Sequence, residues 1–202
     1  RAASAARQGH HDQILAELQA CGPVLPVGFG SVFSGEARLA AWVGGREAVI
    51  LAFLDEVAGA AEWSVRVFGD RSAAVREALR ARVEAAGSGG ASPGAAYMLE
   101  KRLKPQAERD ATALLAEHTD ALLDAVEPAC VALVDRAVGT PAEEGLECVA
   151  HAAALVRSSD RAAFDAALDA AAEAAEPHGL SVELSGPWPA YSFVPEALTK
   201  PC

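Results

Sequence analysis

The sequence lacks long hydrophobic runs and an excess of basic residues, and each absence excludes a class of partner. Charged residues interrupt every apolar stretch before it reaches the roughly 20 residues that a membrane span needs. The 17 lysines and arginines are outnumbered by 28 aspartates and glutamates, which gives a net charge of −11. Such a surface repels phosphate backbones and anionic lipid headgroups. We therefore expect neither a membrane nor a nucleic acid as a partner.

Paired cysteines are lacking too. The four cysteines (Cys21, Cys130, Cys148 and Cys202) are widely scattered, without a CxxC motif, in a chain too large to depend on disulfides. The sequence begins at Arg1 and enters a helical pattern without the apolar segment of a signal peptide. These features predict reduced thiols and a cytoplasmic location, and they indicate that native residues precede Arg1.

Catalytic signatures are missing as well. The sequence has no GxSxG and no HExxH, and the glycines of residues 87–94 lack the lysine and the spacing of a phosphate-binding loop. Cys148 and His151 lie three residues apart in a predicted strand, where their side chains point to opposite faces. We therefore predict no catalytic site, no metal site and no cofactor, and a protein that is not an enzyme.

What the sequence does contain, from Glu62 onward, is a regular succession of strand and helix patterns. Trp63, Val65 and Val67 alternate with polar residues, which is typical of a half-buried strand. The expected strands are 62–68, 130–138, 146–156 and 180–184, with a further strand-like stretch at 24–33. The expected helices are 4–20, 36–43, 47–58, 70–86, 95–126 and 159–177. The apolar stripe predicted for helix 95–126 is Leu99, Leu103, Ala107, Ala111, Leu114, His118, Leu122 and Ala125.

This order of elements is the ferredoxin-like βαββαβ pattern. We predict an α+β protein with a ferredoxin-like C-terminal domain over residues 62–202, preceded by a smaller, N-terminally incomplete α+β domain over residues 1–61. Strands 62–68 and 146–156 are then central, and the last strand lies at an edge. Strand 146–156 is apolar on both faces, so the face without helices needs a cover from the N-terminal segment or from a partner.

Residues 186–194 hold two prolines and three aromatics, in a chain with only 5% aromatic residues. Such a segment is rigid and costly to leave in water, so it docks either on the chain's own core or on a partner. Because it follows an edge strand and its prolines cannot donate to a ladder, we expect it to end the sheet and to fold Trp188, Tyr191 and Phe193 back onto the protein. Docking on the core predicts that Trp188→Ala destabilises the fold by roughly 3 to 5 kcal/mol. Docking on a partner predicts unchanged stability and lost binding.

Four stretches resemble motifs of the gas vesicle protein F/L family, whose members are accessory proteins encoded with the gas vesicle shell protein. They are LPVGFGSVF at 25–33, Glu62-Trp63 at a strand start, AYML at 96–99 and GPWPAYSF at 186–193. The resemblance extends over nearly the whole chain, and the first and last stretches are its most specific parts. The motif residues that we take as candidate structural or interaction residues are Leu25, Pro26, Phe29, Gly30, Glu62, Trp63, Tyr97, Gly186, Pro187, Trp188, Pro189, Tyr191, Ser192 and Phe193.

Two positions depart from the family pattern. Gly28 stands where members usually carry an arginine, and Ala190 stands where a second proline is usual. The first departure removes any contact made by that cation, and the second makes the terminal segment slightly less rigid.

The resemblance implies a non-enzymatic assembly role in the cytoplasm and at the gas vesicle. The implied partners are the hydrophobic major shell protein and other gas vesicle accessory proteins. Limiting shell-protein aggregation, nucleating the vesicle and remaining attached to the shell all stay open. An alternative from a different class is a small-molecule-binding regulatory module, because ferredoxin-like sheets often host ligands and a fold does not fix a function.

Overall fold

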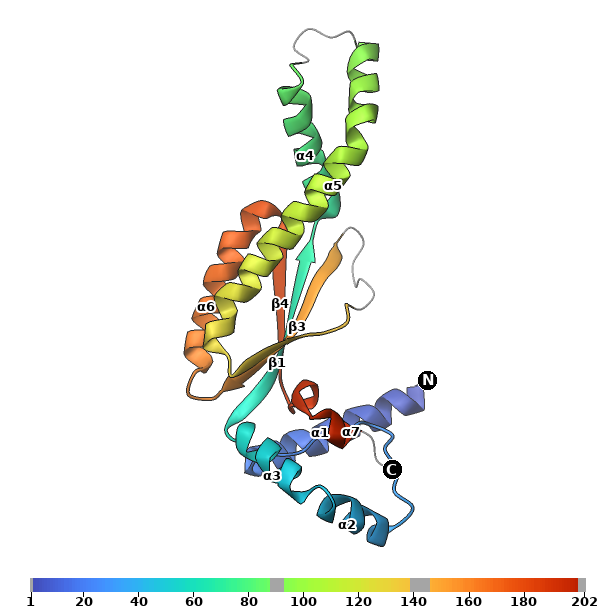
Figure 1. Ribbon diagram of the computed structural model, residues 1–202, viewed down its shortest axis with the longest axis vertical. Helices are drawn as coiled ribbons and strands as arrows, with labels where there is room; N and C mark the ends of the chain where they lie inside the picture. Colours follow the sequence, from blue (N-terminus) through green and yellow to red (C-terminus); the bar gives the residue numbers. More distant parts are fainter. Residues whose placement is uncertain (1, 88–92, 139–145, 200–202) are drawn as a thin grey trace.

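A four-stranded antiparallel sheet forms the centre of the protein (Figure 1). The computed structural model of the chain describes residues 2–87, 93–138 and 146–199. The strands are β1 (Ala60–Gly69), β2 (Ala132–Asp135), β3 (Glu147–Arg157) and β4 (Leu180–Trp188), in the order β2-β3-β1-β4. The two strands predicted to be central are central, and the last strand lies at an edge, as predicted.

Two helices, α5 (Pro93–Val126) and α6 (Arg161–Ala175), cover one face of the sheet (Figure 1). The alternation along β1 points Val65 and Val67 into the core between helices and sheet, where both side chains are fully buried. The other buried members of this core are Leu115, Leu122, Val126, Ala154, Val156, Phe164, Leu168, Ala171, Ala175 and Leu180.

The buried stripe of α5 differs in part from the predicted one. Leu114 is 46% exposed, and Ala125 is exposed too, although both were expected to be buried. The buried positions of α5 are Ala107, Ala111, Leu115, Thr119, Leu122 and Val126. Leu114 and Leu115 are adjacent leucines, so the periodicity alone does not say which one faces the sheet. In the fold it is Leu115, which belongs to the core cluster and lies beside Gly69 of β1.

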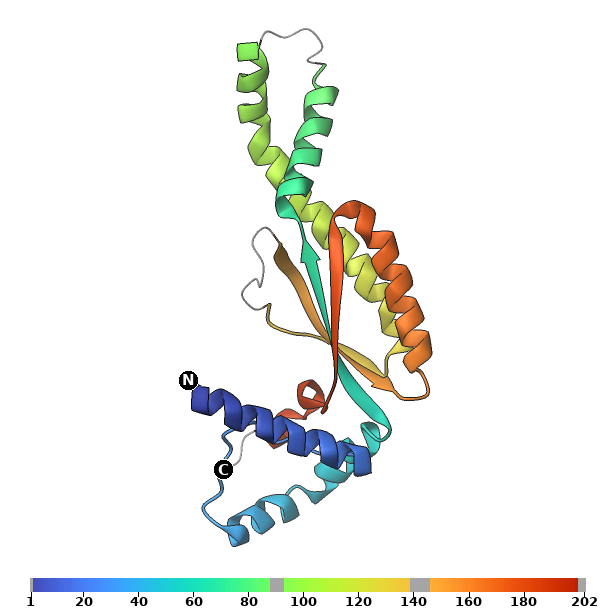
Figure 2. The same ribbon diagram turned by 180° about the vertical axis from the view of Figure 1, so that it is seen from behind.

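α4 (Arg71–Ala85) and the N-terminal half of α5 form a helical hairpin that projects beyond the sheet (Figures 1 and 2). Asp70 caps α4, because its carboxylate accepts a hydrogen bond of 2.8 Å from the Ala73 amide. The hairpin is held by a small alanine cluster of Ala78, Ala107 and Ala111.

The N-terminal part lies at the opposite end of the sheet from the hairpin (Figure 1). It consists of α1 (Ala2–Cys21), α2 (Glu36–Gly44) and α3 (Glu47–Glu56). The prediction of a strand within residues 24–33 is wrong, since this stretch is irregular and pairs with no strand of the described residues. Pro26 cannot donate to a ladder, and Gly30 adopts a positive φ of 88° in a turn, so the stretch packs through side chains instead.

The second face of the sheet is covered at one end by segments from both ends of the chain. Leu155 of β3 packs here against Phe53 of α3, against Val57 directly after that helix, and against Ala190 and Phe193 after β4. The predicted need for a cover is therefore met at this end by the chain itself.

Short elements complete the fold. Three 3-10 turns span Glu127–Ala129, Glu176–His178 and Tyr191–Phe193, and a last short helix, α7, spans Glu196–Thr199. None of the helices in the described ranges is both long enough and apolar enough to cross a bilayer.

Candidate functional site

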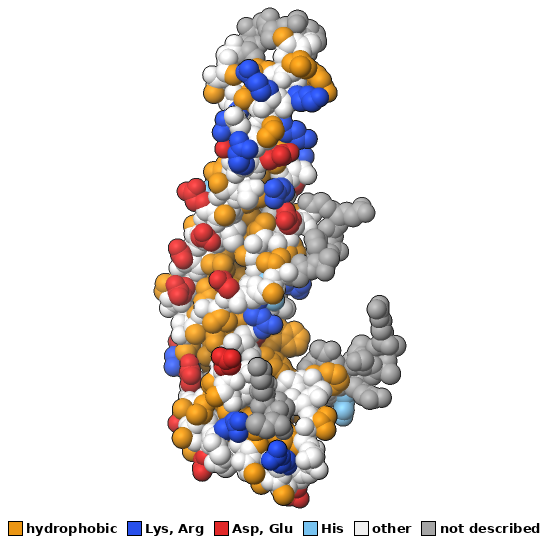
Figure 3. Space-filling view, turned by 45° about the vertical axis from the view of Figure 1, so that its right-hand side comes forward, with side chains coloured by type: hydrophobic (Ala, Val, Ile, Leu, Met, Phe, Trp, Pro, Cys, Tyr) orange, Lys and Arg blue, Asp and Glu red, His pale blue; other side chains and the backbone are white. Residues whose placement is uncertain are grey.

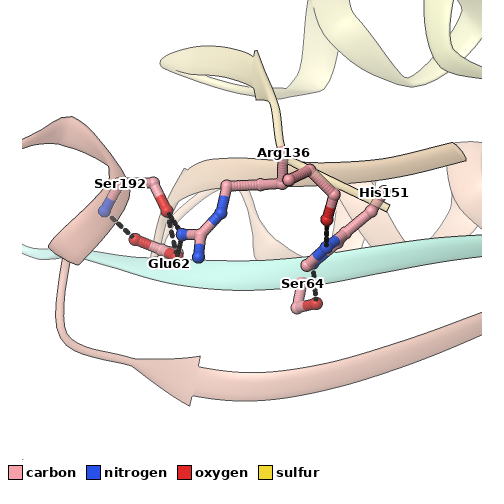
Figure 4. A network of polar contacts seen from close by, with 6 residues as sticks. Glu62, Ser64, Arg136, His151 and Ser192 are labelled. Atoms are coloured by element: carbon pink, nitrogen blue, oxygen red, sulfur yellow. Dashed lines mark hydrogen bonds and ion pairs between the residues drawn. The ribbon is translucent and has the colours of Figure 1, made fainter. Parts of the chain in front are cut away.

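The buried carboxylate of Glu62 holds the terminal motif in place (Figure 4). Glu62 lies near the start of β1, points away from α5 and α6, and is only 5% exposed. Its two oxygens accept hydrogen bonds from Ser192, one of 2.8 Å from the backbone amide and one of 2.6 Å from the hydroxyl. Two motifs far apart in the sequence therefore meet in one contact.

Arg136, just after β2, completes the charge balance of this contact. Its guanidinium lies 3.5 Å from a Glu62 oxygen and donates a hydrogen bond to the Ser192 hydroxyl. The Arg136 amide donates to the carbonyl of His151, which fixes the start of the side chain beside β3. A buried carboxylate with an opposite charge and two donors is a stable arrangement, because no charge is left unpaired.

A second polar pair lies next to this network on the same face (Figure 4). The Ser64 hydroxyl and His151 Nε2 are 2.9 Å apart, and His151 Nδ1 lies 3.3 Å from the carbonyl of Ala137. The third position of a catalytic triad would be a carboxylate, whereas here it is a backbone carbonyl. The described residues also contain no group of three His, Cys, Asp or Glu side chains that could hold a metal ion.

Trp63 points to the helix-covered face and links the other half of the terminal motif to the sheet. The guanidinium of Arg161 lies 3.4 Å from the centre of the Trp63 ring, a cation–π contact, and also pairs with Asp165 at 2.7 Å. Gly186 passes so close to this ring that a Cβ at that position would lie 2.9 Å from a Trp63 ring carbon. The glycine of the motif is therefore required by the tryptophan opposite it.

A cavity of about 590 Å³ opens where the N-terminal part meets the ends of β1, β3 and β4. Its wall includes Trp63 and Arg161 on the sheet side, Pro187 and Pro189 of the terminal motif, and Cys21 at the end of α1. Its size falls in the range of small-molecule sites, roughly 300 to 1,000 Å³.

The predicted site residues fall into three places. Glu62, Trp63 and the terminal motif meet at the junction of the sheet with the N-terminal part. Leu25 packs nearby on the cluster around Leu155, and Pro26 is buried, whereas Phe29 is 45% exposed beside the ring of His11, close to the Gly30 turn. Tyr97 lies far away on the helical hairpin and is 63% exposed.

The expectation that Trp188 folds back onto the core is wrong, because its side chain is 43% exposed. The last strand does not end near Leu184 but continues to Trp188, through a cis bond between Gly186 and Pro187. The strand therefore carries the tryptophan along the open edge of the sheet. The chain turns inward only afterwards, where Pro189 and Ala190 are buried and Phe193 packs on the core.

Sequence reasoning missed Arg136 and Arg161, the two cations of the site. Neither belongs to a motif, and each acts on a partner that only the folded chain brings near: Arg136 on Glu62, and Arg161 on Trp63. The one signal in the sequence is Glu62 itself. A carboxylate near the start of a central strand becomes buried on folding, and it then needs a cation from another part of the chain.

Comparisons with known proteins give one family. The profile described as "Gas vesicle synthesis protein GvpL/GvpF" matches residues 1–195. Gas vesicle protein L1 of Halobacterium salinarum is 27% identical over 206 residues, covering 92% of this chain and 69% of the relative. Gas vesicle protein L of Haloferax mediterranei is 25% identical over 202 residues, covering 93% and 60%.

Two solved structures share the fold. The gas vesicle protein GvpF of Anabaena sp. PCC7120 has a TM-score of 0.66 at 16% identity, covering 92% of this chain and 75% of that one. GvpF of Microcystis aeruginosa has a TM-score of 0.63 at 14% identity, covering 92% and 76%. With a family match along almost its whole length, this chain belongs to the gas vesicle protein L/F family.

Proposed function

We propose that this protein is a non-enzymatic accessory factor of gas vesicle assembly that binds the hydrophobic major shell protein in the cytoplasm. Family membership supports an accessory role at the gas vesicle, and other gas vesicle proteins are further partners. The polar groups of the junction satisfy one another, which suits a structural contact that fixes the N-terminal part on the sheet.

The observation that carries the proposal is the distribution of exposed apolar side chains. Among the residues whose side chains the structure describes, thirteen large hydrophobic ones are exposed, and eight of these lie in the N-terminal part: Ile14, Leu18, Phe29, Val32, Leu39, Val43, Val49 and Leu51. Apolar surface that a folded protein leaves in water is typical of a binding surface for an apolar partner. We assign the shell-protein contact to this part, called the apolar N-terminal surface below.

The strand order and the helices on one face of the sheet support describing residues 62–202 as a ferredoxin-like domain. The division from a smaller domain at residues 1–61 stays a prediction. Val57 and Phe53 pack on Leu155 across that boundary, so we propose that the two parts work as one unit.

The test is co-sedimentation of the purified protein with the major shell protein. We expect the wild-type chain to keep shell protein in the supernatant as a complex. The double variant Val32→Ser/Leu51→Ser removes two side chains that are 80% and 54% exposed. Loss of their apolar contact surface lowers the affinity by about tenfold or more, at roughly 25 cal/mol per Å² buried.

Leu114→Ser is the matched control. Leu114 is 46% exposed, similar to Leu51, but lies on α5 away from the N-terminal part. It should bind like the wild type. Absence of any complex with the wild-type chain, together with unchanged shell-protein aggregation, would overturn the proposed function; equal loss in both variants would overturn the assigned surface.

A second candidate, a small-molecule-binding regulatory module, is favoured by the junction cavity of about 590 Å³. Against it, Arg161 in the cavity wall is already engaged by Trp63 and Asp165. A thermal-shift screen with metabolites decides between the two: stabilisation that disappears in Arg161→Ala supports a ligand site, and no stabilisation supports the assembly role alone.

A further inference from the structure

The helical hairpin is basic although the chain is strongly acidic. Residues 71–104 contain seven lysines and arginines against three glutamates, in a protein with a net charge of −11. In Figure 3, lysine and arginine side chains gather over the hairpin, while most aspartate and glutamate side chains lie lower on the molecule, together with further basic side chains near the lower end. Positive charge is therefore concentrated on the hairpin.

A groove between α4 and α5 contains most of the basic side chains of the hairpin that form no ion pair among the described residues. Its charged lining consists of four basic side chains, Arg71, Arg76, Lys101 and Lys104, and two acidic ones, Glu100 and Glu108, and Tyr97 also lines it. Within the described part of the chain, Arg76, Lys101 and Lys104 make no ion pair, and Arg71 has only a distant partner, Glu147 at 3.7 Å. This set is called the basic groove.

The complementary surface lies on the same protein. Residues 110–135 contain six acidic side chains, and residues 162–182 contain four, and neither stretch has a lysine or arginine. Their exposed members on α5 and α6 include Glu117, Asp120, Asp124, Asp169 and Glu173. These five residues are called the acidic flank.

One molecule cannot bring the two surfaces together. They lie toward opposite ends of α5, a continuous helix of 34 residues that is about 50 Å long at 1.5 Å per residue. A second copy can reach the basic groove, because the hairpin projects freely beyond the sheet (Figures 1 and 2).

We propose that copies of this protein associate head to flank, with the basic groove of one copy on the acidic flank of the next. The two patches differ, so the contact is heterologous and propagates as an open chain of copies unless it closes into a ring. Complementary charge also speeds the encounter, and Tyr97, which is 63% exposed, supplies apolar contact area inside the groove.

Sedimentation velocity of the full chain tests this proposal. At an ionic strength of about 0.01 M, where charges act over about 30 Å, we expect a mass above 20.7 kDa that rises with concentration. At about 1 M salt, where this length falls to about 3 Å, the protein should return to 20.7 kDa. A wild-type chain that stays at the monomer mass at low salt overturns the proposal.

Charge reversal locates the contact. Lys101→Glu/Lys104→Glu removes the groove, and Asp169→Lys/Glu173→Lys removes the flank; all four side chains are exposed, so the fold should persist. Each variant alone should lose association by about tenfold or more, and an equimolar mixture of the two should regain it, since opposite charges again face each other.

Glu36→Lys/Glu47→Lys is the control, because it makes the same change of net charge as the flank variant but on exposed residues of α2 and α3. It should associate like the wild type. Association that persists in both reversed variants, or a mixture that stays monomeric, overturns the assignment. Binding of polyglutamate to the groove without self-association would assign the groove to an acidic segment of a different protein.

Discussion

Glu62 and Ser192 are joined by two hydrogen bonds although they lie 130 positions apart in the sequence. Glu62 lies near the start of the first strand, β1, and Ser192 lies in the 3-10 turn that follows the last strand, β4. Their contact joins the start of β1 to the segment that follows β4. It gives a physical reason why the Glu-Trp and Tyr-Ser-Phe motifs occur in one chain, since the carboxylate of the first accepts hydrogen bonds from the second.

Removing the Glu62 carboxylate should destabilise the contact between β1 and the terminal motif. Glu62→Ala leaves the Ser192 amide and hydroxyl without their acceptor and the Arg136 guanidinium without its ion-pair partner. Since hydrogen bonds to charged groups contribute roughly 1.5–3 kcal/mol each, we expect a loss of about 2 to 4 kcal/mol in the free energy of unfolding, measured by urea denaturation.

Glu183→Ala is the control on the same sheet face. Glu183 pairs with Arg66 at 2.6 Å but is 50% exposed, so its loss should cost less than about 1 kcal/mol. Equal effects of the two substitutions would contradict the role given to Glu62.

A methyl group at position 186 should be poorly tolerated. Gly186 has a φ of 142°, and a Cβ there would lie 2.9 Å from a Trp63 ring carbon and 3.0 Å from the Glu62 carbonyl oxygen. We expect Gly186→Ala to destabilise the protein by about 1 to 3 kcal/mol through overpacking. Gly94→Ala is the comparison, because position 94 in α5 faces open space and alanine favours helix. This variant should be neutral or stabilising. Thermal unfolding of both variants and the wild type measures the two effects.

Truncation of Trp188 should cost less than truncation of a core aromatic. With 43% of the side chain exposed, little more than half of it is buried, so we expect Trp188→Ala to cost about 2 kcal/mol. Phe164→Ala, at a fully buried position, should cost about 3 to 5 kcal/mol in the same chemical denaturation series. A cost for Trp188→Ala as large as that for Phe164→Ala would restore the core role expected from the sequence.

The three described cysteines should differ in reactivity. Burial, together with the nearby Glu127 carboxylate, raises the pKa of the Cys130 thiol from 9.0 to about 11, whereas Cys21 is exposed. The thiolate is the nucleophile, so at pH 8 iodoacetamide should modify Cys21 at least about 100-fold faster than Cys130. Peptide mapping by mass spectrometry at increasing times measures both rates, and comparable rates would contradict the burial of Cys130.

The hairpin should lose an ion pair on acidification. A hydrogen bond from Arg82 lowers the pKa of the Asp110 carboxyl below its ordinary value of 3.8. A lowered folded pKa means that the pair stabilises the fold at neutral pH and that this contribution disappears as pH falls from about 4 through the folded pKa. Asp110→Asn should therefore be less stable than the wild type at pH 7, with the difference vanishing near the folded pKa.

Unfolding midpoints in urea at pH 7 and at pH 3 or below measure this change. Glu77→Gln serves for comparison, because Glu77 pairs with Arg80 within α4 and both side chains are more than two-thirds exposed. That variant should show little difference at either pH. A constant difference between Asp110→Asn and the wild type at all pH values would show that the carboxylate charge is irrelevant.

The local periodicity of the sequence was enough to predict the central sheet. The alternation around Val65 and Val67 and the doubly apolar strand ending near Val156 placed both central strands correctly. Both features depend on which side of a strand is buried, and this is encoded residue by residue. The stretch at 24–33 failed because a strand needs a neighbour to pair with, and propensity does not supply one.

The candidate site was only partly predictable. The motif pointed to Glu62, Trp63 and the terminal segment, which do meet, but not to the exposure of Trp188 or to Arg136 and Arg161. The continuation of β4 as far as Trp188 decides where the tryptophan lies. This continuation does not follow from composition, because it depends on pairing with β1.

The continuity of α5 sets the angular position of the basic groove. Its N-terminal half packs on α4 through Ala107 and Ala111, and its C-terminal half packs on the sheet from Leu115 onward. Each residue turns a helix by about 100°, so one residue inserted between Ala111 and Leu115 would swing the hairpin by about 100° around the helix axis. Seven inserted residues would return it to within about 20°. The number of residues in α5 between its contacts with α4 and its contacts with the sheet therefore fixes the direction in which the hairpin points.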